Sequence, residues 1–340
     1  MREFGSDFHC IEDYFSNRSS LARIYLNSQY LANGRQCIEL LILNNHWKRI
    51  WIPAYFCYEV IESIKRTGIE VVFYRDYPLA NDKEIIPQLK FREGDVLLRM
   101  NFFGFRDFRT NKDIPVPVIE DHTHDLLSHW ALYSDADWCI ASLRKSLPIA
   151  EGGMVWSPKN KTLPECDSIV ENQLLADERW KAMEWKKEYL EGKDIPKELF
   201  RSIYLSTEEQ LESIDYSRID NRSMNYLKQL DINAWNIAKR DNWKLLKSKL
   251  GSKVDILVPE DESCTSFSLV LKLGNKEERD KLRMQMIENQ IYPAVLWNVP
   301  ESISNEIVEF CQTMLSVHCD GRYTLSDILF LTNKLERMLS

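Results

Sequence analysis

The residues of this chain that are most able to do chemistry fall in two short segments. The first is Ile119-Glu120-Asp121-His122-Thr123-His124, and the second runs from Ser142 through Lys145 to Glu151-Gly152-Gly153. A partly buried amine can condense with an aldehyde, and a carboxylate at a strand end can hold a protonated ring nitrogen. A serine hydroxyl and nearby backbone amides can bind a phosphate. A pyridoxal-phosphate (PLP) site requires these groups together.

Each of these residues also has an ordinary structural interpretation. A single lysine is usually a solvated surface group, and a carboxylate at a strand end often only caps the next turn. The context of Lys145 favours chemistry, because Leu143 and Leu147 flank it and two adjacent glycines follow, which lets backbone approach a ligand closely. We therefore predict that Lys145 forms a Schiff base and that Asp121 faces the ring nitrogen. His124 would donate to the phenolate oxygen of the ring.

The first segment also allows a metal-binding interpretation. His122 and His124 form an HxH pair that one face of a strand could present to zinc, with His129 beyond them. Metallohydrolase patterns need further ligands at close spacing, and the other histidines, His9, His46 and His318, are scattered. The metal interpretation is therefore the weaker one, and we predict no metal site.

A helix that begins after a glycine leaves its first amides free to bind an anion. The stretch Asn33-Gly34-Arg35-Gln36-Cys37 has this form. By itself the pattern is common. Upstream of Asp121 and Lys145 it predicts the phosphate cradle of the same site, to which Ser142 would add its hydroxyl.

Helices and strands must alternate to bring these segments together, and the sequence has this alternation. It predicts a mainly parallel, doubly wound sheet with ligands at the carboxyl ends of its strands, where Asp121 and Lys145 both fall. The strands are expected over residues 49–53, 70–74, 95–100, 116–120, 137–141 and 153–156, and helices over 36–44 and 58–66, with a helical stretch around 20–30.

The composition changes after Pro158. Residues 166–250 are charged and helical, which indicates solvated helices with one packed face or, as an alternative, a partner surface. A strand over 266–273 and helices over 277–289 and 324–339 predict a smaller C-terminal α+β domain. We predict an N-terminal segment (1–32), a large PLP-binding domain (33–245) and a small domain (246–340).

Composition excludes several classes of protein. The net charge of −8 argues against a nucleic-acid partner, which requires a basic face. No apolar run approaches the roughly 20 residues that cross a bilayer, and the first residues lack the apolar stretch of a signal peptide. The eight cysteines form no CxxC pair, so we expect free thiols in a reducing cytoplasm.

Taken together, these motifs resemble the DegT/DnrJ/EryC1/StrS family of PLP-dependent sugar aminotransferases, across most of the chain. Residues 34–38 resemble the phosphate-binding turn of that family, and Ile52-Pro53-Ala54-Tyr55-Phe56-Cys57 its PxxT-aromatic strand end. Residues 101–104 are similar to its H-x-x-G segment and residues 119–124 to I-E-D-x-A-Q/H. The run from Ser142 to Gly153 is similar to the imine lysine followed by GEGG.

The resemblance implies a fold-type-I α/β transferase with a seven-stranded-type sheet. It places Lys145 as the catalytic residue and Asp121 and His124 as the ring contacts. It places Arg35, Gln36 and Ser142 at the phosphate, and Cys57 at the position of the ring-stacking aromatic. The chain departs from the family in three places: Cys57 replaces that aromatic, the serine lies three residues before the lysine instead of five, and no segment matches G-Y-N-x-R.

The same resemblance implies a reaction and an assembly. An amino group would pass from glutamate to the keto group of a nucleotide-linked sugar, in a homodimer with its sites at the interface. A PLP-fold protein with a binding or assembly role is the alternative from another class, and a PLP-dependent lyase or dehydratase is a third. Relatives that dehydrate sugars lack the lysine, so Lys145 favours transamination.

Overall fold

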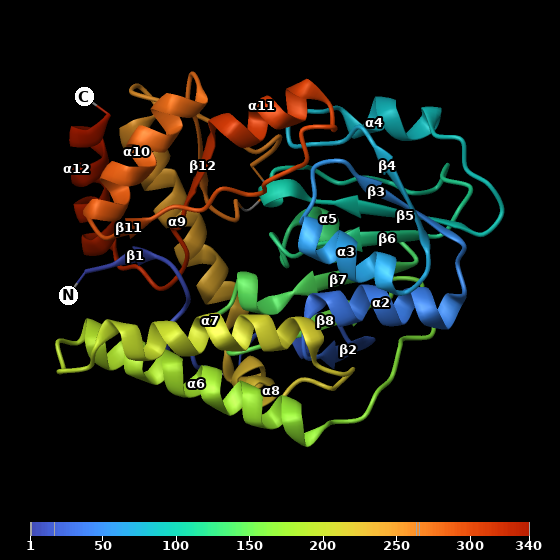
Figure 1. The fold of residues 1–340 in the computed structure, drawn as a ribbon, viewed down its shortest axis with the longest axis horizontal. Coiled ribbons are helices and arrows are strands. Elements are labelled where there is room, and N and C mark those ends of the chain that lie inside the picture. The colour runs from blue at the N-terminus through green and yellow to red at the C-terminus, as the bar shows by residue number, and fades with distance from the viewer. Residues whose placement is uncertain (1, 17, 263, 265, 340) are drawn as a thin grey trace.

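A seven-stranded sheet forms the centre of the chain (Figure 1). The computed structural model describes every residue except 1, 17, 263, 265 and 340. In spatial order the strands are β2 (Ser28–Leu31), β8 (Gly153–Trp156), β7 (Trp138–Ser142), β6 (Val118–Asp121), β5 (Asp95–Met100), β3 (Arg49–Pro53) and β4 (Glu70–Tyr74). Strand β8 pairs antiparallel with both of its neighbours, whereas the other pairings are parallel. The predicted mainly parallel α/β sheet is confirmed.

Short helices connect these strands. They are α2 (Gly34–Asn45), α3 (Tyr58–Arg66), α4 (Asp82–Ile85) and α5 (His129–Tyr133), with 3-10 turns η1 (Ile86–Gln88), η2 (Phe102–Gly104) and η3 (Leu143–Lys145). Helix α2 begins where the Asn33 side chain accepts a hydrogen bond from the Gln36 amide at 3.0 Å. Its buried side chains include Cys37, Ile38 and Leu41, which fix the helix against the sheet.

The charged region after β8 is helical, as predicted. It contains α6 (Val170–Leu190), α7 (Lys197–Ser213), α8 (Asn221–Gln229) and α9 (Ile232–Leu250). Helices α6 and α7 form a long hairpin along one side of the sheet (Figure 1). Trp180 and Met183 of α6 are buried, so this helix has the packed face that the pattern indicated. Among the described residues, no helix combines the length and apolar character that crossing a membrane requires.

A smaller α+β unit follows. Strands β12 (Met314–Val317), β10 (Leu269–Lys272) and β9 (Asp255–Ile256) form an antiparallel sheet, with helices α10 (Lys276–Glu288), α11 (Asn305–Thr313) and α12 (Leu325–Met338). A separate apolar core includes Leu250, Leu269 and Leu331. Strand β1 (Phe4–Gly5) pairs with β11 (Ile291–Tyr292), so the N-terminal strand lies beside this unit. We propose that the small domain begins near residue 246, within α9.

The N-terminal region differs from its prediction. The expected helix around residues 20–30 is limited to α1 (Leu21–Ile24), and residues 28–31 form the edge strand β2. Tyr30 and Leu31 are buried and pair with Met154 and Gly153 of β8. Pairing with β8 therefore makes residues 28–31 a strand instead of a helix, because an edge strand gains its inter-strand hydrogen bonds only from its one neighbour. Part of the predicted N-terminal segment thus belongs to the large sheet.

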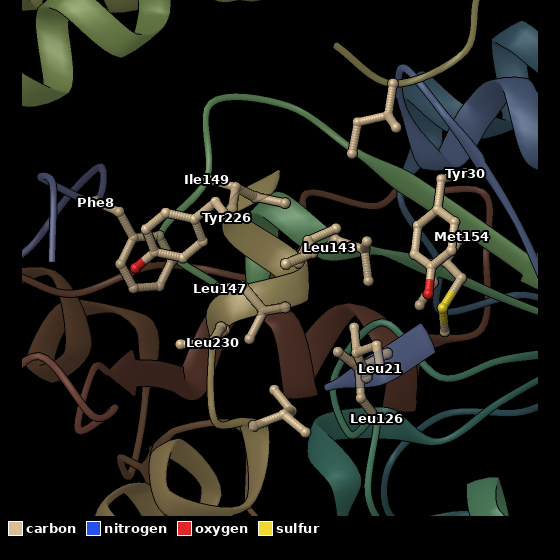
Figure 2. Close-up of a cluster of buried hydrophobic side chains, with 14 of the residues drawn as sticks. Phe8, Leu21, Tyr30, Leu126, Leu143, Leu147, Ile149, Met154, Tyr226 and Leu230 are labelled. Carbon is tan, nitrogen blue, oxygen red and sulfur yellow. The ribbon is translucent and has the colours of Figure 1, made fainter. Parts of the chain in front are cut away.

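One cluster of buried apolar side chains lies around the turn that carries Lys145. Figure 2 shows Leu143, Leu147 and Ile149 of this turn with Phe8 of the N-terminal segment and Tyr226 of α8. Leu143 is 0% and Leu147 1% exposed. The backbone on both sides of Lys145 is therefore fixed in a close-packed core, which gives a ligand at this turn a rigid support.

Candidate active site

The carboxyl ends of β6 and β7 and the N-terminus of α2 open into one cavity of about 390 Å³. It contains six of the seven predicted site residues: Arg35, Cys57, Asp121, His124, Ser142 and Lys145. Parallel strands that share an edge bring their carboxyl ends together, which is why residues distant in the sequence meet here. We refer to this space as the first cavity.

Asp121 forms part of the wall of the first cavity, at the end of β6. Its side chain is buried, and its Oδ1 accepts a hydrogen bond from the Thr123 amide at 2.8 Å. Thr123 in turn accepts a hydrogen bond at its Oγ1 from the Ser142 amide at 2.9 Å, which ties the end of β6 to the end of β7. Burial raises the pKa of Asp121. A positively charged hydrogen-bond donor in the cavity would therefore stabilise the ionised form of this carboxylate.

His124 is held as a neutral hydrogen-bond donor. Its Nδ1 accepts from the Phe103 amide at 2.9 Å, so the ring proton lies on Nε2. Burial, followed by the charges of Lys239 and Lys145, lowers the pKa of His124 to about 3. Phe267 stacks on the imidazole with ring centroids 4.3 Å apart. His124 is thus a fixed, uncharged N–H group in the wall of the cavity.

Lys145 ends the 3-10 turn η3, directly after β7. Its side chain is exposed, and no described residue forms a hydrogen bond or ion pair with its amine. The adjacent Arg144 and then desolvation lower the pKa of Lys145 to about 8, although solvent screening tempers the repulsion. A larger share of the amine is therefore neutral, and able to act as a nucleophile, than for an ordinary surface lysine.

The opposite end of the first cavity lies at the start of α2. A Cβ atom on Gly34 would lie 2.9 Å from the Cβ of Ser142, and one on Gly153 would lie 2.2 Å from the Asn33 carbonyl oxygen. The two glycines therefore allow α2, β7 and β8 to pack in contact. Free amides at a helix N-terminus, the Ser142 hydroxyl and the Arg35 guanidinium make this end suited to an anion. Arg35 is paired with Glu212 of α7 at 3.0 Å.

Gln36 is the predicted site residue whose side chain does not line the first cavity. Its Nε2 donates to the Asp215 carbonyl oxygen at 3.0 Å, and its Oε1 accepts from the Ser217 amide at 3.1 Å. Gln36 thus holds the chain segment that follows α7. The sequence pattern placed it at the start of the correct helix but could not show which way the side chain turns.

The two histidines of the HxH pair have different neighbours. His122 lies 3.2 Å from an oxygen of Glu120 and packs against Trp130, whereas His124 packs against Phe103 and Phe267. They do not converge on one point. The structure instead groups His122 with Glu120 and Cys139, three buried side chains in the core.

The small domain contributes three apolar residues that the sequence did not identify. Phe267, Leu296 and Trp297 line the first cavity, and Trp297 packs near Phe56 and His124. Their only sequence signal is an apolar and aromatic run near residue 297, which predicts burial and no particular partner. The structure also places Glu59, Glu208 and Glu212 at the cavity, where they accept from or pair with Cys57, Arg144 and Arg35.

The groups of the first cavity fit PLP. A buried carboxylate suits a protonated ring nitrogen, a neutral N–H suits a phenolate oxygen, and a free amine suits an aldehyde. The helix N-terminus with Arg35 and Ser142 suits a phosphate. Aromatic side chains from the small domain suit the faces of a flat ring.

Comparisons with known proteins define the fold. No protein-family model and no curated protein matches the sequence. The structure is similar to the aminotransferase TlmJ from Streptoalloteichus hindustanus (10% identity, TM-score 0.67, 99% of each chain covered) and to the putative sugar aminotransferase Spr1654 from Streptococcus pneumoniae (14%, 0.63, 98% of this chain and 94% of that chain). It is also similar to a DegT DnrJ EryC1 StrS aminotransferase from Brucella abortus (12%, 0.58, 94% and 88%). The chain therefore has the fold of these aminotransferases over nearly its whole length, which confirms the expected fold-type-I architecture.

Proposed function

We propose that this chain is a PLP-dependent aminotransferase that moves an amino group from glutamate to the keto group of a nucleotide-linked sugar. The observation that supports this proposal most strongly is that the free amine of Lys145, the buried carboxylate of Asp121 and the neutral N–H of His124 line one cavity. Two structural neighbours are named as a "putative sugar aminotransferase" and a "DegT DnrJ EryC1 StrS aminotransferase", which supports this reaction class.

Each side chain would have a separate role. When bound, PLP condenses with amines and withdraws electrons from the carbon that loses its proton. Asp121 would accept a hydrogen bond from the ring nitrogen and His124 would donate one to the phenolate oxygen. Arg35 and Ser142 would bind the phosphate, with Cys57 beside the ring. Lys145 would hold the cofactor and then move a proton at its Nζ.

Reduction of the PLP-loaded protein with borohydride tests this proposal. We expect one molecule of cofactor to become fixed on the tryptic peptide that contains Lys145. Lys145→Met should abolish the label, whereas the matched control Lys65→Met, on the exposed face of α3, should keep it. A label on another lysine would show that the site assignment is wrong.

The acceptor requires a separate measurement. Pyridoxamine-phosphate-loaded protein should return to the PLP form when a nucleotide-linked keto sugar is added, and the change is visible in the absorption spectrum. A panel of keto sugars with and without the nucleotide distinguishes the two classes of acceptor. Turnover of free keto sugars alone would contradict the nucleotide-linked assignment.

We further propose that the chain acts as a cytoplasmic homodimer. Apolar side chains that are strongly exposed, among them Val170 and Leu174 on α6 and Leu205 on α7, support an interface with a second copy. Buried free thiols such as Cys37 and Cys319 support a reducing compartment. Light scattering at micromolar concentration gives the mass. An active protein of 40.2 kDa in solution would exclude the dimer requirement.

A non-catalytic PLP-fold protein is the second candidate. Two observations favour it. Cys57 lies where the family has an aromatic residue. Three glutamates, Glu59, Glu208 and Glu212, line the cavity that would have to bind the PLP phosphate, and their charge opposes an anion. Absence of the borohydride label at millimolar PLP, in a protein that is folded and dimeric, would support this alternative.

A further inference from the structure

A second cavity of about 270 Å³ adjoins the first. The two share Arg144, Lys145, Phe267 and Leu296 in their walls, so the Lys145 side chain lies where they meet. The N-terminal segment, the turn after β7, helices α6 and α7 and the small domain close the second cavity. Its other lining residues include Asp7, Phe8, Ile149, Arg179, His318 and Arg322.

The second cavity is electropositive. Its walls carry Arg144, Lys145, Arg179 and Arg322, and among its lining residues Asp7 is the single carboxylate. His318 adds no charge at neutral pH, because burial, followed by the charge of Arg322, lowers its pKa to about 4. An anion is therefore the type of ligand that this cavity favours.

Arg322 is already satisfied by protein groups. Its Nε and Nη2 each lie 2.9 Å from an oxygen of Asp320, and its Nη1 donates to the carbonyl oxygens of Ser6 and Asp7 at 3.2 Å. It also packs over the ring of Phe8. Arg322 thus anchors the N-terminal segment, and its guanidinium has little hydrogen-bonding capacity left for a ligand.

Arg144 and Arg179 differ from Arg322, because they share one carboxylate. Nη2 of Arg144 lies 2.6 Å and Nη1 of Arg179 3.5 Å from the two oxygens of Glu208. Arg179 is 5% exposed, and its remaining bonds go to the Ala150 carbonyl oxygen and the Thr207 hydroxyl. Neither Nη1 of Arg144 nor Nη2 of Arg179 donates to a described residue. Two largely buried guanidinium groups thus share one partly exposed carboxylate, which leaves a net positive charge.

The electrostatics of this trio agree with its geometry. Although burial opposes ionisation, Arg144, Lys145 and Arg179 lower the pKa of Glu208 to about 2. Burial and then the charge of Arg144 lower the pKa of Arg179, which shows that the two arginines repel each other. A second carboxylate beside them would relieve that repulsion.

The size and the apolar part of the second cavity restrict the ligand. At roughly 30 Å³ for each group of water size, the cavity holds about nine such groups, close to the ten or so non-hydrogen atoms of glutamate and far below the thirty or more of a nucleotide-linked sugar. Phe8, Ile149 and Met183 provide apolar walls for a short aliphatic chain. The volume of the second cavity therefore matches a small organic acid better than a nucleotide-linked sugar.

We propose that the second cavity binds the carboxylate of the amino acid substrate through Arg144 and Arg179, so that the substrate amine lies at Lys145. This inference rests on the proposed aminotransferase function and assigns its amino donor to a place in the chain. Glu208 acts as a built-in competitor for the two arginines, which sets the affinity for the donor.

Calorimetric titration of the cofactor-free protein with glutarate tests the assignment. Glutarate has the carbon chain and carboxylates of glutamate but no amine, so it binds without reacting. Arg179→Met should weaken binding about tenfold or more, the usual effect of losing a charge-assisted hydrogen bond. Glu208→Gln should tighten it severalfold, because it removes the competing charge and keeps the shape. A merely structural role of Glu208 predicts no tightening.

The controls separate this proposal from the proposed function. Arg35→Met removes a cation of the first cavity only, so it should leave glutarate affinity unchanged while weakening PLP binding. Inorganic phosphate and uridine monophosphate serve as competing probes. Tighter binding of either than of glutarate, with the same dependence on Arg179, would overturn the carboxylate assignment. Absence of glutarate binding at millimolar concentration would also overturn it, whether or not the borohydride label appears on Lys145.

Discussion

Replacing Asp121 by asparagine should stabilise the cofactor-free protein and weaken its cofactor binding. Asp121 is 6% exposed, and no described lysine or arginine forms an ion pair with it. Its hydrogen bonding within the protein comes from Thr123. The ionised carboxylate is therefore incompletely compensated in the cofactor-free state, and the amide of Asp121→Asn fills the same space without the charge.

The pH dependence follows from the direction of the pKa shift. Burial raises the pKa of Asp121 above its ordinary 3.8, so its favourable contribution to stability is present below that value and is lost as pH rises through the raised pKa. The amide of the Asp121→Asn variant does not ionise and has no such loss. The stability advantage of Asp121→Asn should thus be small near pH 4 and largest at neutral pH.

The expected size is modest and measurable. Leaving a buried polar group partly unsatisfied costs about 1–3 kcal/mol, and at about 2 °C per kcal/mol for a large chain this predicts a rise in Tm of about 2–6 °C. Bound PLP reverses the effect, because a hydrogen bond to a charged group contributes about 1.5–3 kcal/mol. PLP affinity should therefore fall about 10- to 150-fold.

Thermal unfolding with and without PLP, at about pH 4.5 and pH 7.5, measures both effects. Glu120→Gln is the matched control, since it removes the adjacent buried carboxylate. Although burial opposes it, the hydrogen bond with His122 lowers the pKa of Glu120, so this variant should lose stability at neutral pH and keep its PLP response. If Asp121→Asn lowered the Tm of the cofactor-free protein and bound PLP normally, the placement of Asp121 opposite the ring nitrogen would be wrong.

Three other changes give direct tests. Gly34→Ala should lower both Tm and PLP affinity, because the new Cβ would lie 2.9 Å from that of Ser142 and overpacking costs about 1–3 kcal/mol. Asp82→Asn should destabilise the chain by about 3–5 kcal/mol in urea unfolding, since it removes the carboxylate that pairs with the buried Arg99 and leaves Arg109 with Glu260 alone. Arg144→Gln removes the charge that lowers the pKa of Lys145 most, so the pH midpoint of PLP labelling should move upward from about 8. An unchanged midpoint would show that Arg144 does not set the charge of Lys145.

The strands of the large sheet were predictable because each is a short apolar run between turns. The ranges expected for β3, β4, β5 and β8 coincide with the observed strands, and α3 also begins and ends where predicted. A parallel sheet covered on both faces requires strands that are apolar on both sides, and this pattern is local. Strand β2 has no such pattern, because Ser28 and Gln29 are polar and only its pairing with β8 makes it a strand.

The convergence of the candidate reactive residues was predictable for a related reason. Asp121 and Ser142 end two buried strands and Lys145 follows the second of them, and the carboxyl ends of those strands share an edge. Phe267 and Trp297 were not predictable, since they reach the first cavity only through the packing of the small domain. For Gln36 the sequence predicted the helix correctly but not the direction of the side chain, which forms hydrogen bonds with the backbone of Asp215 and Ser217.

The charge of the two cavities depends on a helix that the reactive motifs do not include. Glu208 and Glu212 lie one turn apart on α7, a spacing that places both on one face of the helix. From that face they pair with Arg144 beside the lysine and Arg35 at the start of α2. In the proposed function the motif residues would determine the reaction, whereas the glutamates of α7 offset part of the positive charge that faces an anionic ligand. Substitutions of Glu208 and Glu212 on α7 should therefore change the affinity for anionic ligands more than the type of reaction.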